Sequence, residues 1–295
     1  MKPSIHPIAA AAVAVLALAV PARAQRGFDW SGAISPGATL RIFTVNGTVT
    51  VRPSSGGAAR IHAETQNAGS GDEIRYVSAR SGGDLRVCAL RDNATCDDEG
   101  VHTRGGSWRS RRAKGNFTVE VPRGVVVRVS SGNGDVTVDG ATADVHASSG
   151  NGDVRVGTGA ATVRASTGNG TVMVDGARGP VNASSGNGRV AISTASGPVS
   201  ASTGNGRIEV DVASLRGTGD MTFSSGNGPV TLTLPADFSA EVEASTGNGG
   251  FQSDFPLRVV GRMSSHRVSG TIGQGGRRLH ISTGNGSITL RRAGT

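Results

Sequence analysis

A three-residue unit, Gly-Asn-Gly, recurs at a fixed distance from residue 132 onward. Five copies begin 18 residues apart, and three more follow at looser spacing. Two hydroxyl residues precede every copy. The asparagines of the eight copies are Asn133, Asn151, Asn169, Asn187, Asn205, Asn227, Asn248 and Asn285. A fixed period of this length is typical of repeat architectures, in which neighbouring units stack on one another.

Each repeat contains two short segments in which apolar and polar residues alternate. In the unit 135–152, Val136 and Val138 share one face of the first segment, and Val145 and Ala147 share one face of the second. The following copies place Val, Ile or Ala at the same points. Alternation with β-branched residues predicts strands with one buried face. One repeat should therefore hold two strands, two turns and no helix.

Two assemblies fit such a unit. In a β-solenoid each repeat is one coil, and identical side chains stack at the inter-strand spacing of about 4.8 Å. In an antiparallel meander, Asn-Gly would form a two-residue hairpin turn instead. A register held without insertions over five turns favours the solenoid. We therefore predict an all-β fold: a single-stranded, β-helix-like solenoid of 18-residue coils over 116–295, with an irregular all-β N-terminal cap over 25–115.

Residues 1–24 are typical of a secretory signal peptide. Lys2 supplies the positive charge, residues 8–20 the apolar stretch, and Ala22-Arg23-Ala24 the cleavage site. An uncleaved anchor is the alternative, although the apolar run is short for a membrane span. Nothing later in the sequence resembles a transmembrane helix. We expect an exported protein of the periplasm, the cell surface or the extracellular space, with no transmembrane segment in the mature chain.

The region before the regular repeats and the end of the chain should cover the exposed edges of the stack. Alternating runs in 39–90 predict further strands, and Val45–Val49 resembles a degenerate first copy of the repeat. Solenoids need atypical ends that protect their edge strands. At the other end, the strand 287–290 leads into Arg291-Arg292, which predicts a charged closing edge.

Cys88 and Cys96 are the only two cysteines in the sequence. In an exported protein, such a pair most simply forms one disulfide that closes a small loop. A metal or redox pair is the alternative, but the sequence offers no close Cys-x-x-Cys spacing and no histidine nearby. We therefore predict a Cys88–Cys96 disulfide.

A polar, glycine-rich stretch between the cysteines and the repeats holds the densest group of basic residues. Such a cluster could contact an anionic envelope polymer, because Arg side chains pair with phosphate or carboxylate. A solvated loop is the alternative. Without Lys2 and Arg23, 28 basic residues oppose 22 acidic ones, a net charge of +6 that is not by itself a binding signal. The candidate contacts are Arg109, Arg111, Arg112 and Lys114, with Arg155, Arg164, Arg189 and Arg207 on the repeat faces.

Nucleic acid is not an expected partner, because no aromatic stripe accompanies the charge. The histidines are scattered, so no zinc spacing exists. Asp135 and Asp153 could suggest a calcium-loaded repeat, but Thr171, Arg189 and Arg207 occupy the same position in later copies. No serine lies in a Gly-x-Ser-x-Gly elbow with identifiable partners. We expect no cofactor, no metal and no catalytic residue.

The motifs SSGNGDVTVDG and ASTGNGRIEV, and the run NFTVEVPRGVVVRVSSGNGDV that opens the repeats, resemble a bacterial family of adhesin-like proteins. The members of this family are β-strand repeats of unknown function. The segment LRVCALRDNATC is similar to the cysteine-bearing region of that family, and the resemblance covers roughly residues 38–292. It implies a β-solenoid in or outside the cell envelope, with adhesion suggested by analogy of architecture alone.

Three functions remain open at this point. The first is a non-enzymatic adhesin or structural protein that presents variable side chains to an envelope polymer or to a protein partner. The second is a polysaccharide lyase or hydrolase built on a β-helix, which would need clustered acidic and basic residues on one outer face. The third is a periplasmic scaffold or sensor of envelope stress. The sequence leaves the partner, the face used and the oligomeric state open.

Overall fold

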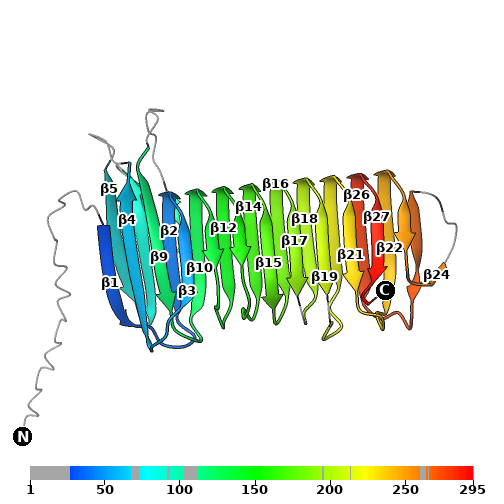
Figure 1. Cartoon of the computed structure of the whole chain (residues 1–295), viewed down its shortest axis with the longest axis horizontal. Coiled ribbons are helices and arrows are strands. Elements are labelled where there is room, and N and C mark those ends of the chain that lie inside the picture. Colours follow the sequence, from blue (N-terminus) through cyan, green and yellow to red (C-terminus); the bar gives the residue numbers. More distant parts are fainter. Residues whose placement is uncertain are drawn as a thin grey trace, which may run out of the picture.

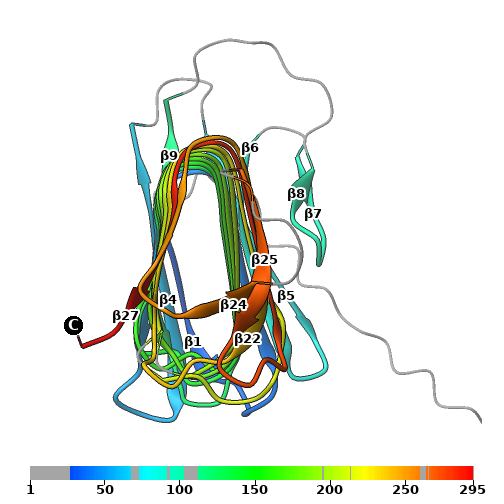
Figure 2. The same ribbon diagram turned by 90° about the vertical axis from the view of Figure 1, so that its right-hand side faces the viewer.

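The protein is an elongated stack of β-coils, described by a computed structural model at residues 27–67, 73–91, 94–102, 112–194, 196–212, 214–259, 264 and 266–294. The 27 strands of these residues form two long sheets, of 12 and 13 strands, and one two-stranded ribbon. The two long sheets, sheet A and sheet B, face each other across a narrow core that runs the length of the stack (Figure 1, Figure 2). The predicted all-β solenoid is confirmed. The predicted signal peptide at 1–24 lies outside the described residues.

Both long sheets consist mainly of parallel strands whose order differs from the order in the chain. Sheet A contains, in spatial order, β1 (Gly27–Ala33), β4 (Ala58–Gln66), β9 (Lys114–Val121), β3 (Val49–Pro53), β11 (Val136–Val138), β13 (Val154–Val156), β15 (Val172–Ala177), β17 (Val190–Thr194), β19 (Ile208–Val212), β21 (Val230–Leu234), β27 (Ile288–Arg292) and β23 (Phe251–Ser253). Sheet B contains β24 (Leu257–Val259), β25 (Arg267–Ile272), β22 (Ala240–Asn248), β26 (Arg278–Asn285), β20 (Met221–Asn227), β18 (Val199–Asn205), β16 (Val181–Asn187), β14 (Val163–Asn169), β12 (Val145–Asn151), β10 (Val126–Asn133), β2 (Thr39–Asn46), β6 (Asp84–Arg91) and β5 (Ile74–Ser81). The ribbon pairs β7 (Thr95–Cys96) with β8 (Val101–His102).

The core consists of identical side chains stacked from coil to coil. Val154 pairs with Val136 on one side and with Val172 on the other, all at 0% exposure. On the facing sheet, Val163 and Ala165 pair with the equivalent Val and Ala of the next coil. The register is thus homotypic, and one apolar pair from each sheet fills the space between the sheets. The inward positions predicted from alternation are those that are buried.

The Gly-Asn-Gly turn forms one sharp corner of every coil, and its asparagines form a ladder along the stack. Each Asn Nδ2 donates to the Oδ1 of its neighbour at 2.6–2.9 Å. Asn46 joins this ladder next to Asn133, which confirms that Val45–Val49 is a degenerate copy of the repeat. In spatial order the ladder runs through Asn46, Asn133, Asn151, Asn169, Asn187, Asn205, Asn227, Asn285 and Asn248.

The second hydroxyl residue before each turn points into the corner and is buried. Thr167, for example, is 6% exposed, and its Oγ1 donates to the carbonyl of Gly152 in the neighbouring coil at 2.7 Å. The equivalent hydroxyls make the same bond along the stack, from Ser131 with Gly47 to Thr283 with Gly228. Because a buried carbonyl without a donor is costly, this row explains the second hydroxyl residue before each turn.

Replacing Thr167 by valine keeps the shape of the side chain but removes the donor to Gly152. We expect the free energy of unfolding to fall by about 1–3 kcal/mol, the cost of leaving a buried polar group unpaired. Thr231→Val, on the outer face of β21, is the matched control and should change the free energy of unfolding little. Urea denaturation followed by circular dichroism measures both; equal effects of the two substitutions would contradict the assigned role of the corner hydroxyl.

The first coil of the chain lies inside the stack. β2 and β3, at 39–53, form a coil that pairs with β10 and β11 on one side. On the other side β2 pairs with β6, and β3 pairs with β9, both in parallel. The chain therefore forms the coil of β2 and β3 first and then the coil of β6 and β9 on its outer side. It continues with β10 and β11 on the opposite side of the first coil.

The last coil of the chain is inserted in the same way. β26 lies between β20 and β22, and β27 lies between β21 and β23 (Figure 1). The prediction that 287–290 with Arg291-Arg292 forms the closing edge is wrong, because the preceding coil of β22 and β23 covers that strand. The physical reason is that every coil can pair in register with any other coil on either side. The final coil can therefore lie between two coils that precede it in the chain. Sheet A ends instead at the short strand β23.

Antiparallel strands close both sheets at the N-terminal end of the stack and sheet B at the other end. β4 pairs antiparallel with β9 and β1 with β4, while β25 and β24 extend sheet B at the other end. At the N-terminal end Tyr76 contacts the rings of Phe28 and Phe117, with centroid distances of 6.0 and 5.8 Å. His62 on β4 lies between two carboxylates, with Nδ1 2.6 Å from Asp29 on β1 and Nε2 3.0 Å from Glu64. Hydrogen bonds to Asp29 and then Glu64 raise the pKa of His62.

The raised pKa of His62 predicts a pH-dependent contribution to stability. A protonated His62 bridges Asp29 and Glu64, so the contribution is complete below the ordinary histidine pKa of about 6.5 and is lost as pH rises through the raised folded value. The side chain is half exposed, so the effect should be small. The midpoints of thermal unfolding of the wild type and of His62→Gln should differ most near pH 5.5 and converge near pH 8. An equal difference between the two midpoints at both pH values would contradict the bridge.

Candidate functional site

Five basic side chains form a row across the outer face of sheet B. They occupy equivalent positions on five neighbouring strands. In each strand the residues before and after the basic residue point into the core. Val127 and Val129, which precede and follow Arg128 in the sequence, are 0% and 2% exposed. Backbone pairing places the five in register. In spatial order this cationic row consists of Arg86 on β6, Arg41 on β2, Arg128 on β10, His146 on β12 and Arg164 on β14.

A row of hydroxyl groups runs beside the cationic row. It comes from the first, outward hydroxyl residue before each Gly-Asn-Gly turn, two positions after Arg128, His146, Arg164 and the equivalent Asn182. These side chains are half-buried and pair in register from coil to coil. The serine row consists of Ser130, Ser148, Ser166 and Ser184.

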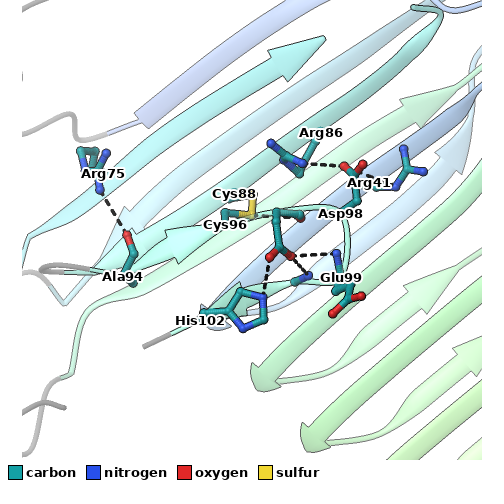
Figure 3. The surroundings of a disulfide bond; sticks show 11 residues. Arg41, Arg75, Arg86, Cys88, Ala94, Cys96, Asp98, Glu99 and His102 are labelled. Atoms are coloured by element: carbon teal, nitrogen blue, oxygen red, sulfur yellow. Dashed lines mark hydrogen bonds and ion pairs between the residues drawn. A yellow bond between two sulfur atoms is a disulfide. The ribbon is translucent and has the colours of Figure 1, made fainter. Parts of the chain in front are cut away.

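The ribbon of β7 and β8 forms a hairpin outside sheet B, held there by the Cys88–Cys96 disulfide (Figure 2, Figure 3). Cys88 points outward from β6, and beneath the hairpin it packs with Phe43, Leu90 and Ala94 in a small apolar cluster separate from the main core. The hairpin is therefore anchored to the outer face of sheet B by a covalent bond and by apolar contacts. Because its sequence contains Asp97, Asp98 and Glu99, its tip is acidic.

The hairpin tip contacts one end of the cationic row. Asp98 Oδ1 lies 2.5 Å from Arg86 Nη1 and 4.0 Å from Arg41 Nε, and Arg41 also pairs with Asp84 at 2.8 Å (Figure 3). A hydrogen bond from Arg41, and then one from the backbone of Thr39, lowers the pKa of Asp84. The first two cations of the row are thus neutralised within the chain.

The rest of the row lies in a groove of about 400 Å³ between the hairpin tip and the outer face of sheet B. Asp98 and Glu99 line the end of this groove at the hairpin, and Arg128, His146 and Arg164 lie along it with the serine row. Neither arginine forms an ion pair with a residue that the structure describes, while Arg164 Nη1 lies 3.4 Å from His146 Nε2. The groove therefore presents two arginines that have no ion-pair partner among the described residues, with the carboxylates of Asp98 and Glu99 at its hairpin end.

His146 contributes hydrogen-bonding capacity to the groove but little charge at neutral pH. Partial burial lowers its pKa, and the positive charges of Arg128 and Arg164 lower it further. Its imidazole is consequently neutral at pH 7. Along the groove, the row thus alternates between charged, neutral and charged side chains.

The structure brings together only some of the residues predicted as contacts from the sequence. Arg112 and Lys114 line a separate depression of about 440 Å³ beside Asn46 and Asn133, at the N-terminal end of the asparagine ladder. Arg109 and Arg111 lie outside the described residues. Among the arginines predicted on the repeat faces, Arg164 lies in the groove, Arg155 lies on the outer face of sheet A, and Arg189 and Arg207 pair with Glu209.

The sequence interpretation missed Arg41, Arg86 and Arg128, because they precede the regular repeats or stand at their edge. A signal for them exists in the shared pattern of an arginine between two apolar residues, as in Leu40-Arg41-Ile42, Leu85-Arg86-Val87 and Val127-Arg128-Val129. Aligning these three segments with the second strand of the repeat would have placed them in one row. The part of the chain that the structure describes contains no group of three His, Cys, Asp or Glu residues able to hold a metal ion.

The family profile named Toastrack DUF4097 matches residues 38–291. No curated protein matches the sequence. Among solved structures, the putative cell adhesion protein of Clostridium sporogenes ATCC 15579 is similar over 90% of this chain and 99% of its own, with 10% identity and a TM-score of 0.32. The putative adhesin of Bacteroides fragilis NCTC 9343 is similar over 90% of this chain and 97% of its own, with 14% identity and a TM-score of 0.44. Within the described residues, no helix is long and apolar enough to cross a membrane.

Proposed function

We propose that this chain, which belongs to the Toastrack DUF4097 family, is an exported, non-catalytic binding protein of the cell envelope. In this proposal the stack is a rod, and the groove on sheet B holds an anionic partner. Export is supported by the signal-peptide pattern of residues 1–24, and an oxidising compartment is supported by the Cys88–Cys96 disulfide. A protein of two packed β-sheets with short corners is also rigid enough to present a fixed row of side chains.

The observation that carries the proposal is a preformed groove that holds two arginines without an ion-pair partner among the described residues. Asp98 neutralises Arg86 and Asp84 neutralises Arg41 at the neighbouring positions, whereas Arg128 and Arg164 lie beside half-buried hydroxyls and form no ion pair with a described residue. A stretch of a concave site that carries positive charge, as the groove does around Arg128 and Arg164, attracts anions from solution and concentrates them. An anionic group bound there would make charge-assisted hydrogen bonds to arginine and further bonds to serine.

The alternative of a polysaccharide-active enzyme finds less support in this groove. Glycoside hydrolysis ordinarily needs two carboxylic acids that flank one bond. Asp98 and Glu99 are adjacent in the chain at one end of the groove, and Asp98 is engaged with Arg86 and Arg41. Incubation of the protein with a panel of anionic polysaccharides and assay for new reducing or unsaturated ends tests this alternative, and turnover would replace the binding proposal.

Co-sedimentation of the purified mature protein with envelope fractions of its host tests the binding proposal. We expect pelleting with one fraction that persists at high salt and is lost in Arg128→Ala/Arg164→Ala. Arg155→Ala, an exposed cation on the outer face of sheet A, is the matched control and should pellet like the wild type. Pelleting only at low salt, or equal loss in the control, would reduce the interaction to unspecific charge attraction and contradict the proposal.

A further inference from the structure

We propose that the ligand of the groove is a linear polysaccharide that carries one carboxylate on every second sugar and lies along the axis of the stack. This inference rests on the proposed function, because it specifies the anionic partner of the same groove. Three features of the groove carry it: the spacing of its charges, the continuity of its hydroxyls and the carboxylate already bound to the same row.

The two arginines of the groove lie two coils apart. Arg128, His146 and Arg164 are in register on consecutive parallel strands. Neighbouring strands lie about 4.8 Å apart, so the two arginines are separated by roughly 10 Å along the stack. This distance is close to the length of an extended 1,4-linked disaccharide. A carboxylate on alternate sugars would therefore meet one arginine after the other, while the intervening sugar faces the neutral imidazole of His146.

The serine row supplies hydrogen-bonding groups at the shorter interval. Each coil contributes one half-buried hydroxyl, so the interval between hydroxyls is one strand spacing, about the length of a single sugar. Serine both donates and accepts hydrogen bonds, as sugar hydroxyls do. Two charges that lie two positions apart, with a hydroxyl at every position, match a polymer in which every sugar carries hydroxyls but only alternate sugars carry a carboxylate.

The hairpin tip indicates that a carboxylate is a fitting ligand for this row. Asp98 pairs with Arg86 and lies 4.0 Å from Arg41 Nε, beside the two positions that precede Arg128 (Figure 3). Asp98 and Glu99 would also repel an anionic chain from that end of the groove. A bound polysaccharide thus begins at Arg128 and runs toward β16 and β18, where Asn182 and Ser200 continue the row with neutral side chains.

Other linear polyanions fit the spacing less well. In an extended acidic peptide, side chains on one face recur at roughly 6.6 Å, twice the rise per residue, which does not match the two arginines. Polyphosphate carries charge on every unit and offers no hydroxyl pattern. Single-stranded nucleic acid is bound through aromatic stacking, but Phe43, the aromatic residue that lines the groove, is 6% exposed.

The inference is tested by titrating four labelled probes into the full mature protein and following fluorescence anisotropy. The probes are oligosaccharides of hyaluronate, with a carboxylate on alternate sugars, oligogalacturonate, with one on every sugar, polyphosphate and polyglutamate. We expect hyaluronate to bind most tightly, and Arg128→Ala and Arg164→Ala each to weaken its binding about tenfold, the effect of about 1.4 kcal/mol. Arg155→Ala should leave it unchanged.

A swap of two residues tests the spacing without changing the composition. The double substitution Arg164→Asn/Asn182→Arg moves the second arginine by one strand, because these two positions are paired in register and both are exposed. We expect hyaluronate binding to fall to the level of Arg164→Ala, with the melting temperature unchanged. Equal binding of all four probes, or a swap without effect, would overturn the alternating-carboxylate ligand but leave an anion-binding groove. If neither a probe nor an envelope fraction depends on Arg128 and Arg164, the proposed function itself fails.

Discussion

Replacing Val172 by aspartate is expected to destabilise the protein by about 5 kcal/mol at pH 7. Val172 is 0% exposed and pairs with Val154 and Val190 in the neighbouring coils. An aspartate there has no partner for its charge and must become protonated, which from an ordinary pKa of about 3.9 costs about 4 kcal/mol at pH 7. Loss of the buried valine adds more than about 1 kcal/mol. Chemical denaturation followed by circular dichroism measures the sum.

The pH dependence of this variant separates buried charge from a simple packing defect. Burial raises the pKa of the introduced carboxyl above its unfolded value, so the penalty grows as pH rises above about 3.9. The difference from the wild type should thus be much smaller at pH 4 than at pH 7. Thr137→Asp, on the outer face of β11 and in register with Arg155, is the control and should change stability little. An unchanged unfolding midpoint for Val172→Asp would contradict the inward orientation of this row.

The repeat itself could be predicted in detail because its constraints are local. The 18-residue period fixes which residues of neighbouring coils pair, and the alternation of Val136, Thr137 and Val138 fixes which side chains are buried. The asparagine ladder follows from the same register, since equal residues at one corner must stack. Even the irregular copy around Asn46 was visible, because the corner needs the same Asn-Gly pair there.

The order of the coils at the two ends could not be predicted in this way. Every coil presents nearly the same pattern of strand and corner residues, so the strand containing Asn285 can pair with almost any other. Which neighbours it takes depends on the connections, such as residues 235–239 and the antiparallel strands β24 and β25. These connections act through tertiary contacts, and their sequences do not follow the repeat. The error about Arg291-Arg292 arose because chain order was taken as spatial order.

The groove was hidden from sequence reasoning for a related reason. Arg164 was noted as one outward residue among dissimilar ones, because consecutive repeats replace it by Asn182 and Ser200. The cationic row exists only when strands from outside the regular repeats, β2 and β6, are placed beside them. The hairpin that borders the groove also depends on a disulfide, whose position on the outer face cannot be inferred from spacing. Repetition therefore predicts the scaffold, and departures from repetition create the site.

Replacing Gly168 by alanine should be nearly as damaging as a charge in the core. A Cβ at Gly168 would lie 2.5 Å from the carbonyl oxygen of Gly150 in the neighbouring coil, closer than real Cβ atoms approach other heavy atoms. The contacting atoms of Gly150 belong to the backbone, which cannot turn aside as a flexible side chain could. The coil of Gly168 would therefore have to move away from the coil of Gly150. That movement would strain the ladder bond between Asn169 and Asn151 and the backbone bond that Gly152 N–H donates to the carbonyl of Asn169.

We expect Gly168→Ala to lower the free energy of unfolding by about 3 kcal/mol, the upper end of the usual cost of overpacking. Gly170→Ala should cost at least as much, because Gly170 also has a φ of +144° and its Cβ would meet the carbonyl of Gly152. Gly56→Ala is the control, since a Cβ there meets nothing within 4 Å. Its stability should equal that of the wild type or exceed it slightly, because alanine restricts the unfolded chain. Equal stability of Gly168→Ala and Gly56→Ala would show that the coils are not stacked as closely at this corner as the structure has them.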